Sequence, residues 1–200
     1  MNGLIDSRNI HSVKRDLVGV CIFIAIIWVA YFLDRFLPLE NLGLVPRTLR
    51  GLTGIVAMPF LHGDFKHLLG NTIPLAVTML LMAGSRANSG AIVAIIALLC
   101  GTGLWLFGRT ALHIGASGVV FGLITFHVFA GIFEKRIQSV LISIVVGLLY
   151  ASTLIQGVVP FQKGVSWEGH LIGALSGAFV ASLVSRTLRV RTPEQGLPSG

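Results

Sequence analysis

Six apolar stretches, each close to the length that crosses a lipid bilayer, constrain this chain more than any other feature of its sequence. They lie at 17–33, 67–83, 91–107, 115–133, 137–155 and 168–185. A transmembrane helix needs about 20 predominantly apolar residues. Hydrophobic residues make up 54% of the chain and charged residues only 12%, more apolar surface than a soluble domain of this length could bury. The sequence therefore predicts an all-α polytopic membrane protein, a six-transmembrane-helix bundle.

The basic residues predict how this bundle is oriented. With six spans both termini lie on one side, and that side carries nine of the 15 Lys and Arg residues. The positive-inside rule places this side in the cytoplasm. We therefore expect an integral protein of a bacterial cytoplasmic membrane, with both termini inside. The net charge of +7 is spread over juxtamembrane positions, which favours membrane lipids as partners and disfavours nucleic acid.

The chain divides into three segments. Residues 1–16 form a cytoplasmic N-terminal segment, 17–186 the membrane domain, and 187–200 a disordered cytoplasmic tail. Two connections are long. We expect 34–66 to form an interfacial helix or hairpin, because long loops without structure are uncommon. The connection 156–167 is a candidate lid that moves to admit a ligand.

Two polar residues open apolar stretches at the same end of the predicted bundle. Ser117 begins the fourth stretch and His170 the sixth. A serine hydroxyl becomes a nucleophile when a base removes its proton, and a neutral imidazole is the usual base. Taken singly, Ser117 could be a packing residue of a glycine-rich helix and His170 a hydrogen-bonded residue between helices. Taken together, they predict a nucleophile and its base.

Glycines and one aromatic residue accompany this pair. Small residues at helical spacing let two membrane helices approach closely, and here they are Gly115, Gly118, Gly173 and Gly177. Phe121 lies one turn after Ser117, where it can stack on the imidazole of His170. Glu168 lies on a different face of the helix from His170. The pattern therefore predicts a catalytic dyad rather than a triad.

The start of the second stretch offers donors for an oxyanion hole. His67 and Asn71 are four residues apart, so they share one helix face. Both can donate to a developing negative oxygen together with the backbone amide of Ser117. The alternative is that they only cap and join helices. No metal-binding or phosphate-binding motif occurs, and we expect neither a metal nor another cofactor.

Three motifs in order resemble the rhomboid intramembrane serine proteases. They are His62-x4-His67-x3-Asn71, Gly115-Ala116-Ser117-Gly118 and Gly169-His170-x2-Gly173-x3-Gly177. The resemblance covers about residues 40–185. It implies a six-helix core with Ser117 and His170 as the catalytic pair. It also implies His67 and Asn71 in the oxyanion hole, and Phe121 as the ring stacked on the catalytic histidine.

The same resemblance implies an activity and its partners. A rhomboid protease cleaves transmembrane segments of single-pass or polytopic membrane proteins near their outer ends, without a cofactor. One departure is the first outer loop, where Gly54-Ile55-Val56-Ala57-Met58-Pro59-Phe60 replaces a Trp-Arg pair that many members carry. Two alternatives remain: a non-catalytic rhomboid-like protein that binds membrane clients, and a small transporter or channel. The second would need polar residues through the cytoplasmic half of the bundle, and the first, third and fifth stretches supply almost none.

The remaining histidines have simpler interpretations. His62 lies in the loop before the second span, and we expect a structural or cavity-lining role. His113 is expected in a loop. His127 lies ten residues after Ser117, about 15 Å deeper along the helix, and is expected to pack between helices.

Overall fold

The computed structural model describes residues 7–83, 89–160, 162 and 164–190. Its long helices are α1 (Ser7–Leu33), α3 (Phe65–Met82), α4 (Ser89–Phe107), α5 (Ser117–Glu134), α6 (Ile137–Gly157) and α7 (Trp167–Val190). Among the described residues, six helices are long and apolar enough to cross a membrane. Their bounds follow the apolar stretches of the sequence closely. The predicted all-α, six-helix bundle is confirmed, and the chain is an integral membrane protein.

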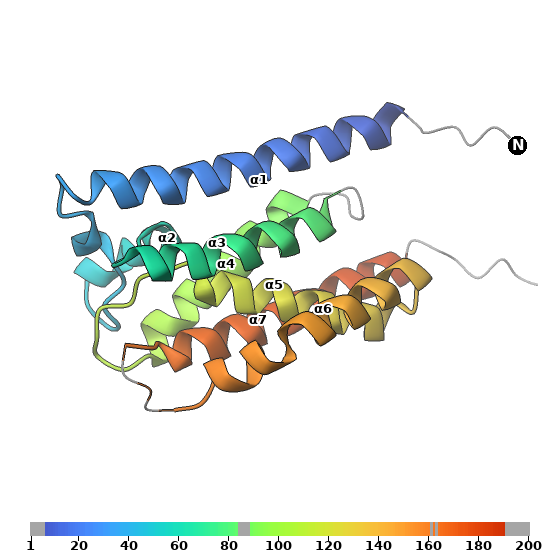
Figure 1. The fold of residues 1–200 in the computed structure, drawn as a ribbon. Coiled ribbons are helices and arrows are strands. Elements are labelled where there is room, and N and C mark those ends of the chain that lie inside the picture. The colour runs from blue at the N-terminus through green and yellow to red at the C-terminus, as the bar shows by residue number, and fades with distance from the viewer. Residues whose placement is uncertain (1–6, 84–88, 161, 163, 191–200) are drawn as a thin grey trace, which may run out of the picture.

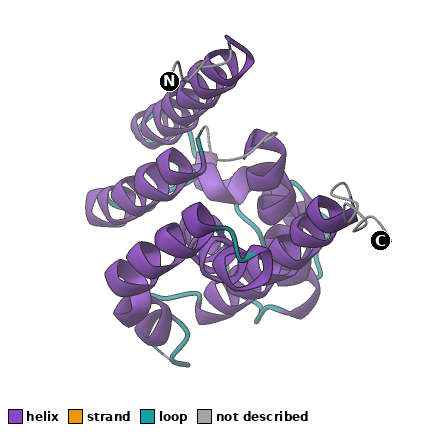
Figure 2. Ribbon diagram, turned by 90° about the vertical axis from the view of Figure 1, so that its right-hand side faces the viewer, coloured by secondary structure: helices purple, strands orange, loops and turns teal. Residues whose placement is uncertain are grey.

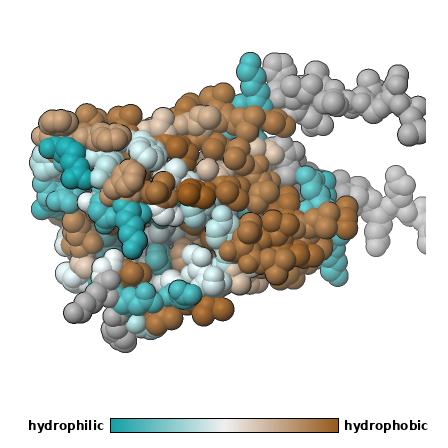
Figure 3. All heavy atoms as spheres, in the orientation of Figure 1, coloured by the Kyte–Doolittle hydropathy of each residue, from teal (hydrophilic) through white to brown (hydrophobic). Residues whose placement is uncertain are grey.

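The long helices run side by side, with three connections gathered at one end (left in Figure 1). These connections are 34–64, 108–116 and 158–166. In the space-filling view hydrophilic side chains collect at this end, while hydrophobic ones cover much of the helices (Figure 3). This distribution suits a bundle whose sides face lipid and whose ends face water.

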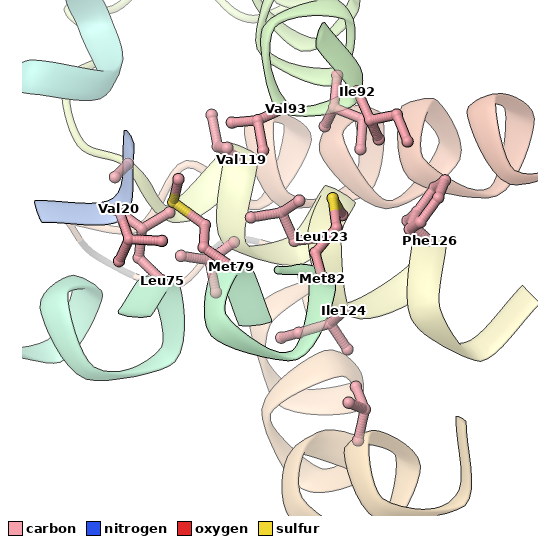
Figure 4. Packing of buried hydrophobic residues seen from close by; sticks show 14 of the residues in the cluster. Val20, Leu75, Met79, Met82, Ile92, Val93, Val119, Leu123, Ile124 and Phe126 are labelled. Atoms are coloured by element: carbon pink, nitrogen blue, oxygen red, sulfur yellow. The ribbon is translucent and has the colours of Figure 1, made fainter. Parts of the chain in front are cut away.

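Helix α5 is the most enclosed of the six membrane-spanning segments. It packs most extensively against α7, and then against α6, α3 and α4. Figure 4 shows its residues Leu123, Ile124 and Phe126 among side chains from the neighbouring helices, including Leu75 and Met79 of α3. A helix that is apolar on all sides belongs inside a bundle. Because α5 begins with Ser117, this packing fixes the position of the candidate nucleophile.

The long connection after α1 carries structure of its own, as expected, but it forms short helical turns rather than one interfacial helix or hairpin. These are η1 (Leu39–Leu42), η2 (Arg50–Leu52), α2 (Gly54–Ala57) and η3 (Met58–Phe60). They are tied to the end of α4: Arg47 Nη1 donates to Gly108 O at 2.8 Å, and Trp105 Nε1 donates to Thr48 O at 3.0 Å. The connection is therefore packed onto the bundle.

Two predicted boundaries differ from the structure. Helix α7 continues to Val190, and Thr187 Oγ1 donates to Leu183 O at 3.1 Å. The first residues of the predicted disordered tail, 187–190, are therefore helical, because a helix can extend past its apolar stretch when the next residues have adequate helix propensity. The rest of that tail, 191–200, lies outside the described residues. The predicted lid loop is also shorter, since α6 includes Gln156 and Gly157 and α7 begins at Trp167.

Candidate functional site

Ser117 is the first residue of α5 and follows a sharp turn of the backbone. Gly115 has φ of +115°, a conformation that side chains other than glycine rarely adopt. A Cβ at Gly115 would lie 2.6 Å from both Cε1 and Nε2 of His67. Glycine is therefore required here both by the turn and by the imidazole that covers it. The turn leaves Ser117 half-buried at the end of the bundle where the loops gather.

The His170 ring, in the first turns of α7, is held at one edge and on one face. Its Nδ1 lies 2.8 Å from the backbone oxygen of Gly157, at the end of α6. The Phe121 ring stacks on it with centroids 4.2 Å apart and an interplanar angle of 5°. A carbonyl oxygen can only accept, so the hydrogen bond assigns the proton of the neutral ring to Nδ1. That assignment leaves Nε2 with a free lone pair, which is the state a general base needs.

Glycines bring α5 and α7 into backbone contact beside these two residues. A Cβ at Gly173 would lie 2.0 Å from Gly118 O, and one at Gly177 would lie 1.8 Å from Gly122 O. A Cβ at Gly118 would lie 3.2 Å from Gly169 O. The contact joins the residue after Ser117 to the residue before His170.

Among the described residues, no hydrogen bond joins the Ser117 hydroxyl to the His170 ring. Hydrogen bonds of this kind are often long without substrate and tighten when it binds. The backbone contact between Gly118 and Gly169 keeps the two residues on neighbouring helix ends.

Asn71 and His67 face the turn before Ser117 from α3. The Asn71 side chain is 6% exposed, and its Nδ2 has no hydrogen-bond partner within the described part of the chain. This nitrogen would lie 3.5 Å from a Cβ at Gly115, on the same side as His67. Asp64 caps α3 by accepting from the backbone N–H of His67 at 2.8 Å. Buried donors rarely remain unpaired, so this amide is placed for an acceptor that enters from outside.

His62 contacts the turn before Ser117 and is more closely involved than the sequence interpretation suggested. Its Nε2 accepts from the backbone N–H of Ala116 at 3.4 Å, and its ring lies edge-on to that of His67 with centroids 5.1 Å apart. Burial, followed by the neighbouring His67, lowers the pKa of His62 to about 4, and the charge of Asp64 opposes this shift. Its Nδ1 has no hydrogen-bond partner among the described residues. The x4 spacing to His67 was the only sequence signal for this position.

The protein should lose stability as the pH falls from about 6.5 to about 4. Unfolded His62 takes up a proton near pH 6.5, whereas the folded ring does so only near pH 4. Between these two pH values the unfolded state therefore binds more protons than the folded state. The contribution of His62 to stability is complete only above about pH 6.5 and is lost as the pH falls toward 4. This residue should account for a loss of about 2 kcal/mol between pH 7.5 and pH 5. Thermal unfolding of the detergent-solubilised protein at several pH values measures it.

The matched variant is His62→Gln, whose side chain can still accept from Ala116 but does not titrate. Its unfolding temperature should depend less on pH than that of the wild type over the same window. Equal pH dependence in both proteins would show that His62 is not held neutral by burial.

An ion pair and a histidine hydrogen bond link the start of α7 to the connection between α4 and α5. Arg109 Nη1 lies 2.9 Å from Glu168 Oε2, and its Nη2 donates to Val165 O at 2.7 Å. His113 Nδ1 lies 2.7 Å from Ser166 Oγ, and its Nε2 lies 3.1 Å from Arg109 O. Burial lowers the pKa of His113, which keeps its ring neutral and able to accept a hydrogen bond. Glu168 is thus committed to Arg109, as expected for a residue outside the catalytic pair.

Replacing Arg109 by glutamine should lower the unfolding temperature. Glu168 is 8% exposed, and removing its partner leaves a buried carboxylate without compensation, at a cost of about 1–3 kcal/mol. Thermal unfolding should show a fall of several degrees. The double variant Arg109→Gln, Glu168→Gln should recover part of it. The exposed Arg50, which donates to Asn41, provides the control: Arg50→Gln should change little.

In the described part of the chain, the remaining histidine and the buried cysteine form hydrogen bonds with backbone oxygens of neighbouring helices, not with the candidate catalytic side chains. His127 Nε2 lies 2.9 Å from Thr78 O, between α5 and α3, which is the packing position expected for it. Cys100 is buried, with its Sγ 3.6 Å from Gly169 O behind the contact of α5 and α7. Within the described ranges, no three His, Cys, Asp or Glu side chains converge in a way that could hold a metal ion.

Comparison with known proteins agrees with the arrangement of these helices. A family model described as "Rhomboid domain" matches residues 49–187. An uncharacterized protein of Mycobacterium tuberculosis is 37% identical over 176 residues, which cover 82% of this chain and 72% of that protein. An uncharacterized protein of Mycobacterium leprae is 33% identical over 180 residues, or 84% of this chain and 71% of that protein. The match includes the helices that carry Ser117, His170, His67 and Asn71.

Proposed function

Because the chain belongs to the rhomboid family, we propose that it is an intramembrane serine endopeptidase acting on transmembrane segments of other membrane proteins. The observation that carries the proposal is the state of His170. Its Nδ1 hydrogen bond to Gly157 O and its stacking on Phe121 leave Nε2 free to accept a proton. Ser117 begins the helix whose next residue, Gly118, packs against Gly169.

The reaction begins with attack by Ser117 Oγ on the carbonyl carbon of a substrate peptide bond. Nε2 of His170 takes the hydroxyl proton, which makes the ring an imidazolium, and the carbonyl oxygen becomes negative. The proton then passes from Nε2 to the leaving nitrogen, the C–N bond breaks, and an acyl-enzyme remains on Ser117. A water molecule attacks this ester with the same proton route in reverse, releasing the acid product and restoring Ser117.

Gly157 O and Phe121 take the place that an acidic residue holds in a triad. The carbonyl oxygen accepts from Nδ1 in both protonation states of His170 and so fixes the tautomer, while the Phe121 face fixes the ring plane. The electron-rich face of an aromatic ring also favours a cation stacked on it. The proposal therefore needs no carboxylate beside His170, and Glu168 stays paired with Arg109.

The developing oxyanion is stabilised at the turn before Ser117. The donors are Asn71 Nδ2, the His67 ring and the backbone amide of Ser117. The buried Asn71 nitrogen that lacks a partner in the described chain supports this role. The Ala116 N–H, by contrast, is directed to His62. His62 thus positions the turn, and one donor such as Asn71 contributes about 3–4 kcal/mol in the transition state.

Substrate would reach this site from the side of the bundle. Helix α6 has the smallest buried share of the six spans and packs mainly on α5, so it is the helix best able to move. The connection 158–166, between α6 and α7, is the proposed lid. A small residue at the cleaved bond suits a site crowded by glycines. By the positive-inside rule this end of the bundle faces away from the cytoplasm, in a bacterial cytoplasmic membrane.

Labelling with a fluorophosphonate probe tests the activity directly. The purified chain in detergent should form a covalent adduct on Ser117, located by mass spectrometry. Ser117→Ala should remove the label and His170→Ala should reduce it strongly, while Ser182→Ala, on an exposed serine of α7, should not change it. A folded wild-type protein that takes no label, or a label that persists in Ser117→Ala, would instead favour a non-catalytic protein that binds membrane clients.

A further inference from the structure

One hollow in the described part of the molecule lies away from the candidate catalytic residues. It has a volume of about 610 Å³ and is lined by α1, α3, α4 and the helical turns 55–60. Its walls include Val20, Phe23, Met79, Met82, Val93 and Ala97. None of Ser117, His170, His67 and Asn71 lines it. We call it the α1 groove.

The groove exists because α1 stands apart from the other helices. In the view of Figure 2 the helix beside the N label lies at the edge of the bundle. Helix α1 packs on α3 and η3 and hardly meets α4. Figure 4 shows Val20 of α1 near Met79 of α3, and the labelled Val93 belongs to the α4 wall. The groove therefore occupies the space where α1 and α4 would otherwise touch.

Two glycines show that this space is open. A Cβ at Gly19 of α1 or at Gly90 of α4 would meet no atom within 4 Å, although both residues line the groove. The glycines between α5 and α7 behave differently, since a Cβ there would overlap backbone atoms. Among membrane-spanning helices, an apolar hollow that opens to the side is filled by the surrounding lipid, because empty space forfeits dispersion contacts.

One end of the groove is polar. Arg15, Asp16 and Ser89 line it there, near the start of α1 and at the first residue of α4. Ser89 is 5% exposed, and its hydroxyl has no hydrogen-bond partner among the described residues. The Arg15 side chain is 67% exposed, with Nε 4.0 Å from a carboxylate oxygen of Asp16. This end lies opposite the loops near Ser117, at an end of the spans, where lipid headgroups are expected.

These groups suit the phosphate of a lipid. An exposed guanidinium binds phosphate oxygens with several N–H groups, and a buried hydroxyl without a partner adds a further donor. Among the described residues that line the groove, Asp16 is the one acidic group, and its carboxylate oxygen lies 4.0 Å from Arg15 Nε.

The polar end of the groove favours a phospholipid over a transmembrane helix. A phospholipid joins an acyl chain to a phosphate, which matches an apolar groove of about 610 Å³ that ends at Arg15 and Ser89. An apolar helix in the groove would leave the Ser89 hydroxyl, which has no partner among the described residues, still unpaired. We propose that the α1 groove binds one phospholipid, with an acyl chain between α1, α3 and α4 and its phosphate against Arg15 and Ser89.

Native mass spectrometry of the full chain in detergent, titrated with palmitoyl-oleoyl phosphatidylglycerol, tests this proposal. The wild type should retain one lipid more tightly than any others, and dioleoylglycerol, which has no phosphate, should bind at least about fivefold more weakly. Arg15→Gln should weaken phosphatidylglycerol binding by a similar factor while leaving the apolar walls of the groove unchanged. Gly19→Leu should place a side chain inside the groove and abolish tight binding.

The matched control is Gly147→Leu on α6, because Gly147 does not line the α1 groove and a Cβ there would also meet no atom within 4 Å. It should bind lipid as the wild type does, and circular dichroism should show all variants folded. Equal binding by wild type and Gly19→Leu, or by the phospholipid and dioleoylglycerol, would overturn the proposal. So would a dimer that Gly19→Leu dissociates, since a second copy would then occupy the groove. No readout depends on proteolysis.

Discussion

Ser117→Ala is expected to stop cleavage of a model transmembrane substrate in liposomes, with a fall in rate of about 10⁴-fold or more. Loss of the nucleophile of a serine protease leaves only the contribution of binding and of the oxyanion hole. Cleavage is measured by gel electrophoresis of the substrate after reconstitution with each variant. His170→Ala should reduce the rate about as far, because Ser117 is a poor nucleophile without its base.

The double variant Ser117→Ala, His170→Ala should be no slower than either single variant, since residues that act as a unit are not additive. Asn71→Ala should differ from both, with a loss of about 10²–10³-fold, the effect of one oxyanion donor. Ser182→Ala, on the exposed face of α7, controls for the loss of a serine. Residual cleavage by Ser117→Ala within tenfold of wild type would contradict the proposed mechanism.

The sequence predicted the bundle because the hydrophobic pattern alone decides where membrane-spanning helices form. Each of the six apolar stretches corresponds to a helix, and the differences are at the ends. Val190 ends α7 beyond the predicted boundary because polar residues can continue a helix after the membrane span. Hydropathy carries no information about that continuation, nor about the short turns within 34–64.

The sequence predicted those contacts of the candidate site that are made by side chains belonging to recognisable motifs. The glycines beside Ser117 and His170 indicated two neighbouring helices, and Phe121 was expected to stack on the His170 ring, as it does in the structure. The acceptor for His170 Nδ1 is a backbone oxygen of Gly157, and backbone atoms leave no trace in residue identity. The pairing of Arg109 with Glu168 joins residues 59 positions apart, and only the folded chain shows it.

Gly173→Ala is expected to destabilise the protein by about 3 kcal/mol and to remove most of its activity. The new Cβ would lie 2.0 Å from the backbone oxygen of Gly118, and backbone cannot move aside as a flexible side chain can. Helices α5 and α7 must then separate, at the cost typical of overpacking a tight interface. Thermal unfolding should show a midpoint lower by about 6–12 °C. Cleavage should fall further than stability explains, because α7 carries His170.

Gly147→Ala on α6 is the matched control for this prediction. A Cβ at Gly147 would meet no atom within 4 Å, so the substitution should be neutral or stabilise the helix by up to about 1 kcal/mol through its higher helix propensity. The two substitutions add the same methyl group to helices of the same bundle, and they differ only in what the methyl group meets. If Gly173→Ala unfolded at the wild-type temperature and cleaved normally, α5 and α7 would not be in backbone contact. The proposal that Ser117 and His170 act together depends on that contact and would then have to be abandoned.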